Sequence, residues 1–151
     1  MPIPEPKRLV PDTYTFPGFR PEPAVRGVFG DPKARVIPLK RRSKKTVCRG
    51  CGRTHSGRYD RKLRRVRELP CGDTRVYLKL EVRRVFCRRC GTVKRECLSF
   101  LVDNPLYTKR FAFYVGRHCR SAFIQDVARE LHLDWHTVKA LEKMRVCAPP
   151  G

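Results

Sequence analysis

The fold of this 151-residue chain is decided by the stretch Val76-Tyr77-Leu78-Lys79-Leu80-Glu81-Val82-Arg83-Arg84-Val85-Phe86-Cys87-Arg88-Arg89-Cys90-Gly91. In residues 76–83, apolar and polar side chains alternate strictly, which is the pattern of a strand with one buried face. The pair Arg83-Arg84 breaks this alternation and predicts a bulge. The stretch then ends in a Cys-x-x-Cys-Gly motif. We therefore expect a strand that delivers two cysteines to a metal-binding turn.

A second motif, Cys48-Arg49-Gly50-Cys51-Gly52, is nearly a copy of the first. In each motif the two-residue spacing lets both thiolates reach one tetrahedral ion, and the following glycine lets the backbone turn. Four thiolates favour zinc over cations that prefer oxygen ligands. Four protein ligands leave no open position for catalysis, so the ion should be structural. The predicted ligands of one structural zinc ion are Cys48, Cys51, Cys87 and Cys90.

The 35 residues between Cys51 and Cys87 exceed the roughly 15–20 of compact four-cysteine sites. This length predicts a long hairpin between two knuckles, as in an extended zinc ribbon. The turn signal Pro70-Cys71-Gly72-Asp73 separates the alternating strand from residues 59–69, which we expect to be a partner strand or an irregular segment. The four-cysteine zinc-binding β domain is therefore expected to span residues 44–98.

Other interpretations of the cysteines stay open at this point. The two pairs could be unrelated buried thiols or a redox dithiol, and His55 could replace one ligand. We expect a strong chelator to unfold residues 46–95, and retention of the strand signal under the chelator would contradict this. The other four cysteines are expected to be small buried or incidental residues: Cys71, Cys97, Cys119 and Cys147.

The chain carries 35 Lys and Arg against 14 Asp and Glu, a formal net charge of +21. Residues 33–95 hold 23 of the basic and four of the acidic side chains, whereas residues 1–32 balance to zero. So basic a segment needs a polyanion, and double-stranded DNA is favoured over an anionic membrane or an acidic protein. Solubility alone would not require such segregation. The candidate phosphate contacts are Arg61, Lys62, Arg64, Arg65, Arg83 and Arg84.

The first 38 residues contain nine of the 13 prolines. Because proline fixes φ and has no backbone donor, we expect no regular helix or central strand here. Residues 1–43 are predicted to be an extended, partly ordered arm, although interspersed apolar residues could form a short strand. No stretch is long and apolar enough to cross a bilayer, and the first eleven residues lack an export signal. We therefore expect a cytoplasmic, nucleoid-associated protein of bacterial type with no membrane partner.

Residues 106–146 change to helical periodicity and predict three helices. Residues 125–141 fit a helix-turn-helix, with small Ala128 where the helices meet and His132 at the turn position that glycine commonly fills. Asp134 would cap the second helix, which would lie in the major groove of DNA. Its outward residues are expected to be Trp135, His136, Lys139 and Lys143. Alternatively, Trp135 anchors the core, or the block is an ordinary three-helix interaction domain.

These motifs, in this order, resemble the N-terminal region of insertion-sequence transposases of the ISL-three family, over roughly residues 20–145. The resemblance rests on the two cysteine motifs and on Tyr59-Asp60, Arg67-Glu68-Leu69, Glu81-Val82-Arg83-Arg84-Val85, Tyr107-Thr108-Lys109-Arg110-Phe111, Asp126-Val127-Ala128 and Trp135-His136-Thr137-Val138-Lys139. The expected fold is α+β. It comprises a proline-rich N-terminal arm, a small zinc-ribbon-like β domain, and a three-helix helix-turn-helix domain.

The resemblance implies that both domains recognise the terminal inverted repeats of an insertion sequence. It also implies that a catalytic DDE domain, with carboxylates and two divalent metal ions, follows them. Since this sequence stops at Gly151, we expect a truncated, catalytically inactive transposase that binds DNA without cutting it. Further expected partners are full-length transposase or a second copy of the chain.

The main alternative is a transcription regulator built from a zinc ribbon and a helix-turn-helix. An RNA-binding module is less favoured, because such modules present exposed aromatic side chains for stacking. Tyr77 is the only obvious aromatic residue on the polar face of the basic strand.

Overall fold

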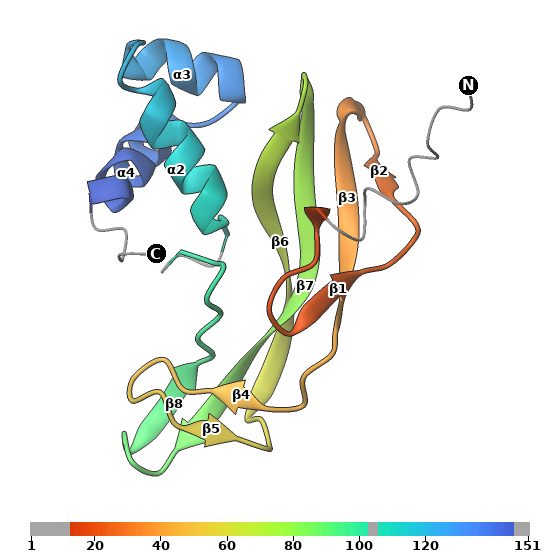
Figure 1. Ribbon diagram of the computed structural model, residues 1–151, viewed down its shortest axis with the longest axis vertical. Coiled ribbons are helices and arrows are strands. Elements are labelled where there is room, and N and C mark those ends of the chain that lie inside the picture. The colour runs from red at the N-terminus through yellow and green to blue at the C-terminus, as the bar shows by residue number, and fades with distance from the viewer. Residues whose placement is uncertain (1–12, 103–105, 147–151) are drawn as a thin grey trace.

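The computed structural model describes residues 13–102 and 106–146 and shows an α+β chain with a sheet beside a helical block (Figure 1). The strands are β1 (Phe19–Pro21), β2 (Arg26–Val28), β3 (Asp31–Arg41), β4 (Thr46–Val47), β5 (Thr54–His55), β6 (Asp60–Cys71), β7 (Thr74–Cys87) and β8 (Thr92–Arg95). The helices are α2 (Lys109–His118), α3 (Ile124–Leu131) and α4 (Trp135–Val146). The main sheet has the order β1-β3-β7-β6, with β2 paired to β3 and β8 to β7, whereas β4 and β5 form a second, two-stranded sheet.

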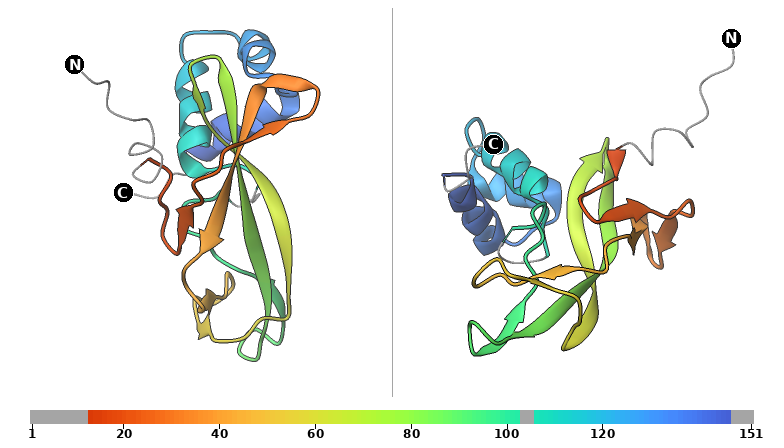
Figure 2. Two further views of the ribbon diagram at one scale, coloured as in Figure 1. Left: turned by 90° about the vertical axis from the view of Figure 1, so that its right-hand side faces the viewer. Right: turned by 60° about the horizontal axis from the view of Figure 1, so that its bottom comes forward.

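The long hairpin expected between the two cysteine motifs is present as β6 and β7. The strands pair antiparallel, and Gly72 adopts a φ of +61° in the turn that joins them. Leu78 and Leu80 of β7 are fully buried, as the alternating pattern predicts. Figures 1 and 2 show the hairpin running between the helices at one end of the molecule and β4, β5 and β8 at the other.

The bulge predicted at Arg83-Arg84 is wrong. The hairpin pairs without interruption through both arginines, which lie opposite Arg61 and Asp60. The alternation breaks for a different reason: the apolar side chains before Arg83 are buried on one face of the sheet, and the apolar side chain after Arg84 is buried on the other. Val82 belongs to the main core, whereas Val85, on the opposite face, packs in a separate cluster with the cysteines.

The prediction that residues 1–43 contain no central strand is wrong for the part that the structure describes. β3 lies between β1 and β7, and it pairs parallel with β7 from Ala34 to Pro38. Residues 36–39 are all buried, as expected for a strand covered on both faces. The sheet therefore includes segments that precede residue 44. The part of the predicted arm in residues 1–12 lies outside the described residues.

Pro38 is tolerated in β3 because its nitrogen, which carries no hydrogen, faces a gap between two short strands. β1 pairs with β3 only from Leu39 onward, and β2 pairs with it only up to Val36. On that side the Pro38 carbonyl accepts a hydrogen bond of 2.8 Å from the Glu22 amide. No ladder hydrogen bond is lost at such a position, so the usual objection to a proline in a central strand does not apply.

The main core covers one face of the sheet and draws on segments far apart in the sequence. Its buried members are Phe16, Phe19, Ile37, Leu39, Val66, Val76, Leu78, Leu80, Val82 and Leu101. The segment after β8 crosses this face, and the Phe16 and Phe100 rings stack with centroids 4.6 Å apart. The N-terminal strands and the segment that follows the second cysteine motif therefore share one core.

A buried ion pair joins the end of β3 to the residue that follows β8. Arg41 donates to the two carboxylate oxygens of Glu96 at 2.7 and 2.6 Å, and the Glu96 side chain is 2% exposed. Arg41 also donates to the Glu81 carbonyl at 3.0 Å. Glu96 in turn accepts from the Arg83 amide at 2.9 Å. Because the two charges are paired in bidentate geometry and further hydrogen-bonded, their burial is tolerated.

The three expected helices are present and form a second core from Phe111, Ala112, Val115, Val127, Ala128, Leu131, Val138 and Leu141. The Thr108 hydroxyl caps α2 by accepting from the Phe111 amide at 3.2 Å. His132 ends α3 with a φ of +53°, the left-handed conformation of a helix C-terminus. No helix among the described residues is long and apolar enough to span a membrane.

A buried polar junction on β6 attaches the helical block to the sheet. Arg67 donates to the Leu131 carbonyl at the end of α3, at 2.7 Å. The adjacent Glu68 accepts from the Thr108 hydroxyl at 3.0 Å and from Arg110 Nε at 2.8 Å. The Thr108 amide also donates to the Arg67 carbonyl at 3.1 Å. These contacts fix the helices relative to the hairpin.

Candidate metal centre and nucleic-acid interface

The four cysteines predicted to bind zinc meet at one end of the long hairpin. Cys87 is the last residue of β7, and Cys90 lies in the turn that leads to β8. Cys48 and Cys51 lie in the turn between β4 and β5. The hairpin therefore spans the sequence gap of 35 residues and returns the chain to its starting point.

The two cysteine motifs form the same turn. The Gly52 amide donates to the Cys48 carbonyl, and the Gly91 amide donates to the Cys87 carbonyl, each at 2.8 Å. The glycines have φ values of +75° and +73°, in the left-handed region that side chains disfavour. The glycine after each motif is thus required by the backbone conformation of the turn.

The spacing of the sulfur atoms fits one tetrahedral zinc ion. The four Sγ atoms lie within 4.8 Å of one another. The Cys48 and Cys90 sulfurs are 3.8 Å apart, and the Cys51 and Cys87 sulfurs are 3.5 Å apart. A zinc ion with Zn–S bonds of about 2.3 Å holds its sulfurs about 3.8 Å apart. When bound, zinc supplies a structural cross-link between the two motifs.

The local environment separates the acidities of these thiols. The Cys90 amide donates to Cys87 and lowers the pKa of that thiol to about 6, with further contributions from neighbouring thiols and His55. Burial and the other three thiols raise the pKa of Cys90 to about 12. Such a split is expected because one thiolate makes the ionisation of its neighbours more difficult. A divalent cation removes this repulsion and favours four thiolates.

The structure separates the remaining candidates from the metal centre. Cys71 and Cys97 are exposed, and Cys119 packs against the helical core. Cys147 lies outside the described residues. His55, considered as a replacement ligand, is a residue of β5 and lies near Cys87. It is not one of the converging ligand atoms, which all come from the four cysteines.

The six basic residues predicted to contact phosphates lie on two faces of the hairpin rather than on one. The register of β6 and β7 places Lys62, Arg64 and Arg84 on the face of Val82. The same register places Arg61, Arg65 and Arg83 on the opposite face. One flat polyanion surface cannot contact all six side chains in the same way.

The face of Val82 carries an open, basic pocket. Its volume is about 450 Å³, and its lining includes Lys62, Arg64, Arg84 and Arg95. Arg84 is oriented by its ion pair with Asp60, and the hydrogen bond from Arg84 lowers the pKa of that carboxyl. Lys62 and Arg64 have no acidic partner within residues 13–102 and 106–146. Their charges are thus available to a phosphate.

Charges on the opposite face are partly neutralised. Glu81 accepts from Arg83 Nε at 2.5 Å and from Arg61 at 3.4 Å. Arg65 lies over the Tyr77 ring, 5.9 Å from its centroid. The face of Val82 is therefore the stronger candidate for a phosphate contact.

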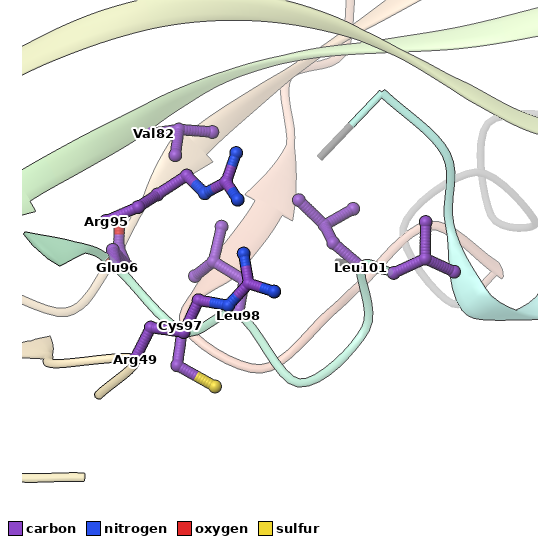
Figure 3. Close-up of a pocket in the computed structure, with 8 residues that line it drawn as sticks. Arg49, Val82, Arg95, Glu96, Cys97, Leu98 and Leu101 are labelled. Atoms are coloured by element: carbon purple, nitrogen blue, oxygen red, sulfur yellow. The ribbon is translucent and has the colours of Figure 1, made fainter. Parts of the chain in front are cut away.

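A smaller pocket lies where the segment after β8 crosses the sheet. Figure 3 shows Arg49 and Arg95 on one side of it and Leu101 on the other. Its volume of about 40 Å³ has room for a few water molecules but not for a nucleotide. It belongs to the packing of the core and not to a ligand site.

The residues predicted to face outward on α4 do so. Trp135, His136, Lys139 and Lys143 are exposed, whereas Val138 and Leu141 are buried in the helical core. Trp135 is 37% exposed and lies outside that core, so the alternative role of a core anchor does not hold. The Lys139 ammonium lies 4.9 Å from the centroid of the Trp135 ring. This face is thus both basic and aromatic.

Tyr59, Phe86 and Arg95 are candidate residues of the nucleic-acid interface that were not predicted from the sequence. Tyr59 and Phe86 are exposed beside the metal centre, and Arg95 pairs with Arg84 across β7 and β8. The signal for Phe86 was present: once Val85 is buried, its neighbour in the strand must face the other way. Nothing in the sequence indicated that Tyr59 would lie next to it.

The segment that holds the metal centre resembles known proteins. Residues 44–90, which include all four cysteines, match the family described as zinc-finger of transposase IS204/IS1001/IS1096/IS1165. Over 112 residues the chain is 38% identical to a protein of Bordetella parapertussis named "Transposase for insertion sequence element IS1001". The aligned region is 74% of this chain, and the chain spans 28% of that relative. No solved structure matches.

Proposed function

We propose, from the match of residues 44–90 to a transposase zinc finger, that this chain is the DNA-recognition part of an insertion-sequence transposase. In this proposal it binds the terminal inverted repeats of the element. One observation carries the proposal: the matched segment holds a four-cysteine cluster of zinc geometry at the end of a strongly basic hairpin.

Two surfaces would share the work of binding. Lys62, Arg64 and Arg84 on the hairpin would contact phosphates, and each such contact releases counterions from the DNA. Residues on α4 would contact base edges in the major groove, as the second helix of a helix-turn-helix does. The exposure of Trp135 and Lys139 and the three-residue turn between α3 and α4 support this role.

We further propose that residues 1–151 bind DNA without cutting it. Catalysis of strand transfer needs carboxylates that converge on divalent ions. Acidic side chains of the hairpin and its surroundings are instead engaged by basic ones: Asp60 by Arg84, Glu68 by Arg110, Glu96 by Arg41, and Asp73 by Lys33. Product in a magnesium- or manganese-dependent strand-transfer assay with the purified chain would contradict this.

A chain that occupies the terminal repeats would also compete with a full-length transposase for them. This competition needs no direct contact between the two proteins. Co-expression with the active transposase should therefore lower the transposition frequency. An equal frequency with and without the chain would remove the competition from the proposal.

Nuclease footprinting tests the recognition itself. Labelled duplexes carry the two ends of the insertion sequence that encodes the chain, and a duplex with the repeats scrambled serves as the control. Protection confined to the repeats is expected. Protection at a host promoter instead of the repeats would favour a transcription regulator, and uniform protection would mean that binding is not sequence-specific.

A further inference from the structure

A second open pocket lies next to the metal centre, between the residues that follow β5 and the end of β7. Its volume is about 340 Å³. Arg58, Tyr59 and Phe86 contribute to its lining. Gly57 also lines it, and a Cβ added to Gly57 would have no atom within 4 Å, so the space beside this residue is open. The pocket is thus accessible and has no acidic residue in its lining.

Two aromatic rings at this pocket do not pack into the hydrophobic cores. Tyr59 is 61% exposed and Phe86 is 54% exposed, and neither belongs to any of the three apolar clusters of the described residues. A single exposed aromatic residue is ordinary, but two that line one pocket in a strongly basic segment indicate a surface for a flat ligand.

Arg84 connects this pocket to the basic pocket on the face of Val82. Its guanidinium lies 5.6 Å from the centroid of the Tyr59 ring and also lines the basic pocket. Asp60 fixes the orientation of that guanidinium. The Tyr59 amide also donates to the Arg84 carbonyl at 2.7 Å, so the two residues are held together by the backbone as well. Aromatic rings and phosphate-binding side chains therefore form one continuous surface.

We propose that this surface binds unpaired nucleotides of DNA, with bases stacked on Tyr59 and Phe86 and phosphates along Lys62, Arg64 and Arg84. Aromatic rings beside a basic groove are how proteins hold single strands without reading their sequence. In a duplex the base faces are covered by their neighbours, so the rings can stack only on bases that are unpaired. This inference rests on the proposed function in that it takes the ligand to be DNA.

Fluorescence anisotropy with three 12-nucleotide probes tests the inference: single-stranded DNA, the matching duplex, and RNA of the same sequence. The variant Tyr59→Leu/Phe86→Leu removes both rings and keeps apolar side chains. The control Phe123→Leu changes a side chain on the helical block that is 81% exposed. Tyr59→Phe keeps the ring and should bind like the wild type. Zinc content and circular dichroism verify that each variant folds.

We expect the double variant to lose affinity for single-stranded DNA by about tenfold or more, with duplex affinity unchanged, since each stacked base contributes substantially to binding. The Phe123→Leu control should change neither. Equal losses on both DNA probes, or no loss, would overturn the inference, as would a wild-type chain that binds duplex but not single strands. Tighter binding of the RNA would overturn the assignment to DNA. Failure of the wild type to bind duplex would instead contradict the proposed function.

Discussion

At the scale of single residues, identical side chains have different roles because the fold places them differently. Cys87 lies among three other sulfurs, whereas Cys71 lies exposed in the turn of the same hairpin. Both were visible in the sequence, and the Cys-x-x-Cys-Gly spacing separated them correctly. The glycines could also be predicted, since the turn requires a positive φ directly after each motif.

Cys87→Ser should abolish zinc binding and unfold the region around the metal centre. Structural zinc sites provide about 10–16 kcal/mol of apparent binding free energy, more than a small basic β unit can replace. Zinc content by atomic emission and thermal melting by circular dichroism measure the effect. Cys71→Ser is the matched control and should leave both unchanged. Retention of one zinc ion per chain by Cys87→Ser would contradict the assignment of the ligands.

Glu81 should make stability depend on pH in the acid range. Burial alone would raise its pKa, but the hydrogen bond from Arg83 and the charges of Arg41 and Arg61 outweigh this and hold the pKa below its usual value. A lowered pKa in the folded state stabilises the fold above the unfolded pKa of about 4.3. This contribution is lost as the pH falls through the folded-state pKa.

The variant Glu81→Gln isolates this effect. The difference in unfolding free energy between wild type and Glu81→Gln should be largest at neutral pH. It should shrink as the pH falls from about 4.3 through the folded-state pKa, because the carboxylate is protonated first in the unfolded state and only then in the folded state. Urea denaturation at several pH values measures it, and loss of zinc at low pH affects both proteins alike. A difference that did not change with pH would rule out this role for Glu81.

At the scale of elements, the hairpin and the three helices were predictable because each has a clear hydrophobic period. β3 was not, although its run Val36-Ile37-Pro38-Leu39 is a continuous apolar stretch of the kind that buried parallel strands show. The proline rule outweighed that signal. It failed because only the arrangement of β1 and β2 reveals that the Pro38 nitrogen faces a gap.

The junction between β6 and the helices could not be predicted either, because it joins residues 40 to 64 positions apart. Glu68→Ala should lower stability by about 3 kcal/mol, since it leaves Arg110 and the Thr108 hydroxyl in the junction without the carboxylate to which they donate. This is the lower end of the range for a broken buried pair, because the Arg110 side chain is 37% exposed. Asp73→Ala, which removes an exposed pair with Lys33, is the control and should have little effect in urea denaturation.

At the scale of the whole molecule, affinity and sequence preference are expected to reside in different elements. Residues 33–95, which include the hairpin, carry most of the positive charge, whereas α4 presents a smaller basic and aromatic face. Lys139→Ala should therefore reduce the preference for the terminal repeat over a scrambled duplex. Arg64→Ala should weaken binding to both duplexes equally and lower the salt dependence by about 0.9 in the slope of log K against log salt. Equal effects of the two substitutions on preference would contradict this division.

Two dissociation constants test most directly whether the chain recognises the ends of an insertion sequence. The zinc-loaded chain is titrated by fluorescence anisotropy into a duplex of the terminal inverted repeat and into a scrambled duplex of the same composition, at about 150 mM salt. We predict a preference for the repeat of about a thousandfold, at the lower end for specific DNA-binding proteins. Equal affinity for the two duplexes would contradict the claim that the chain recognises the ends of an insertion sequence.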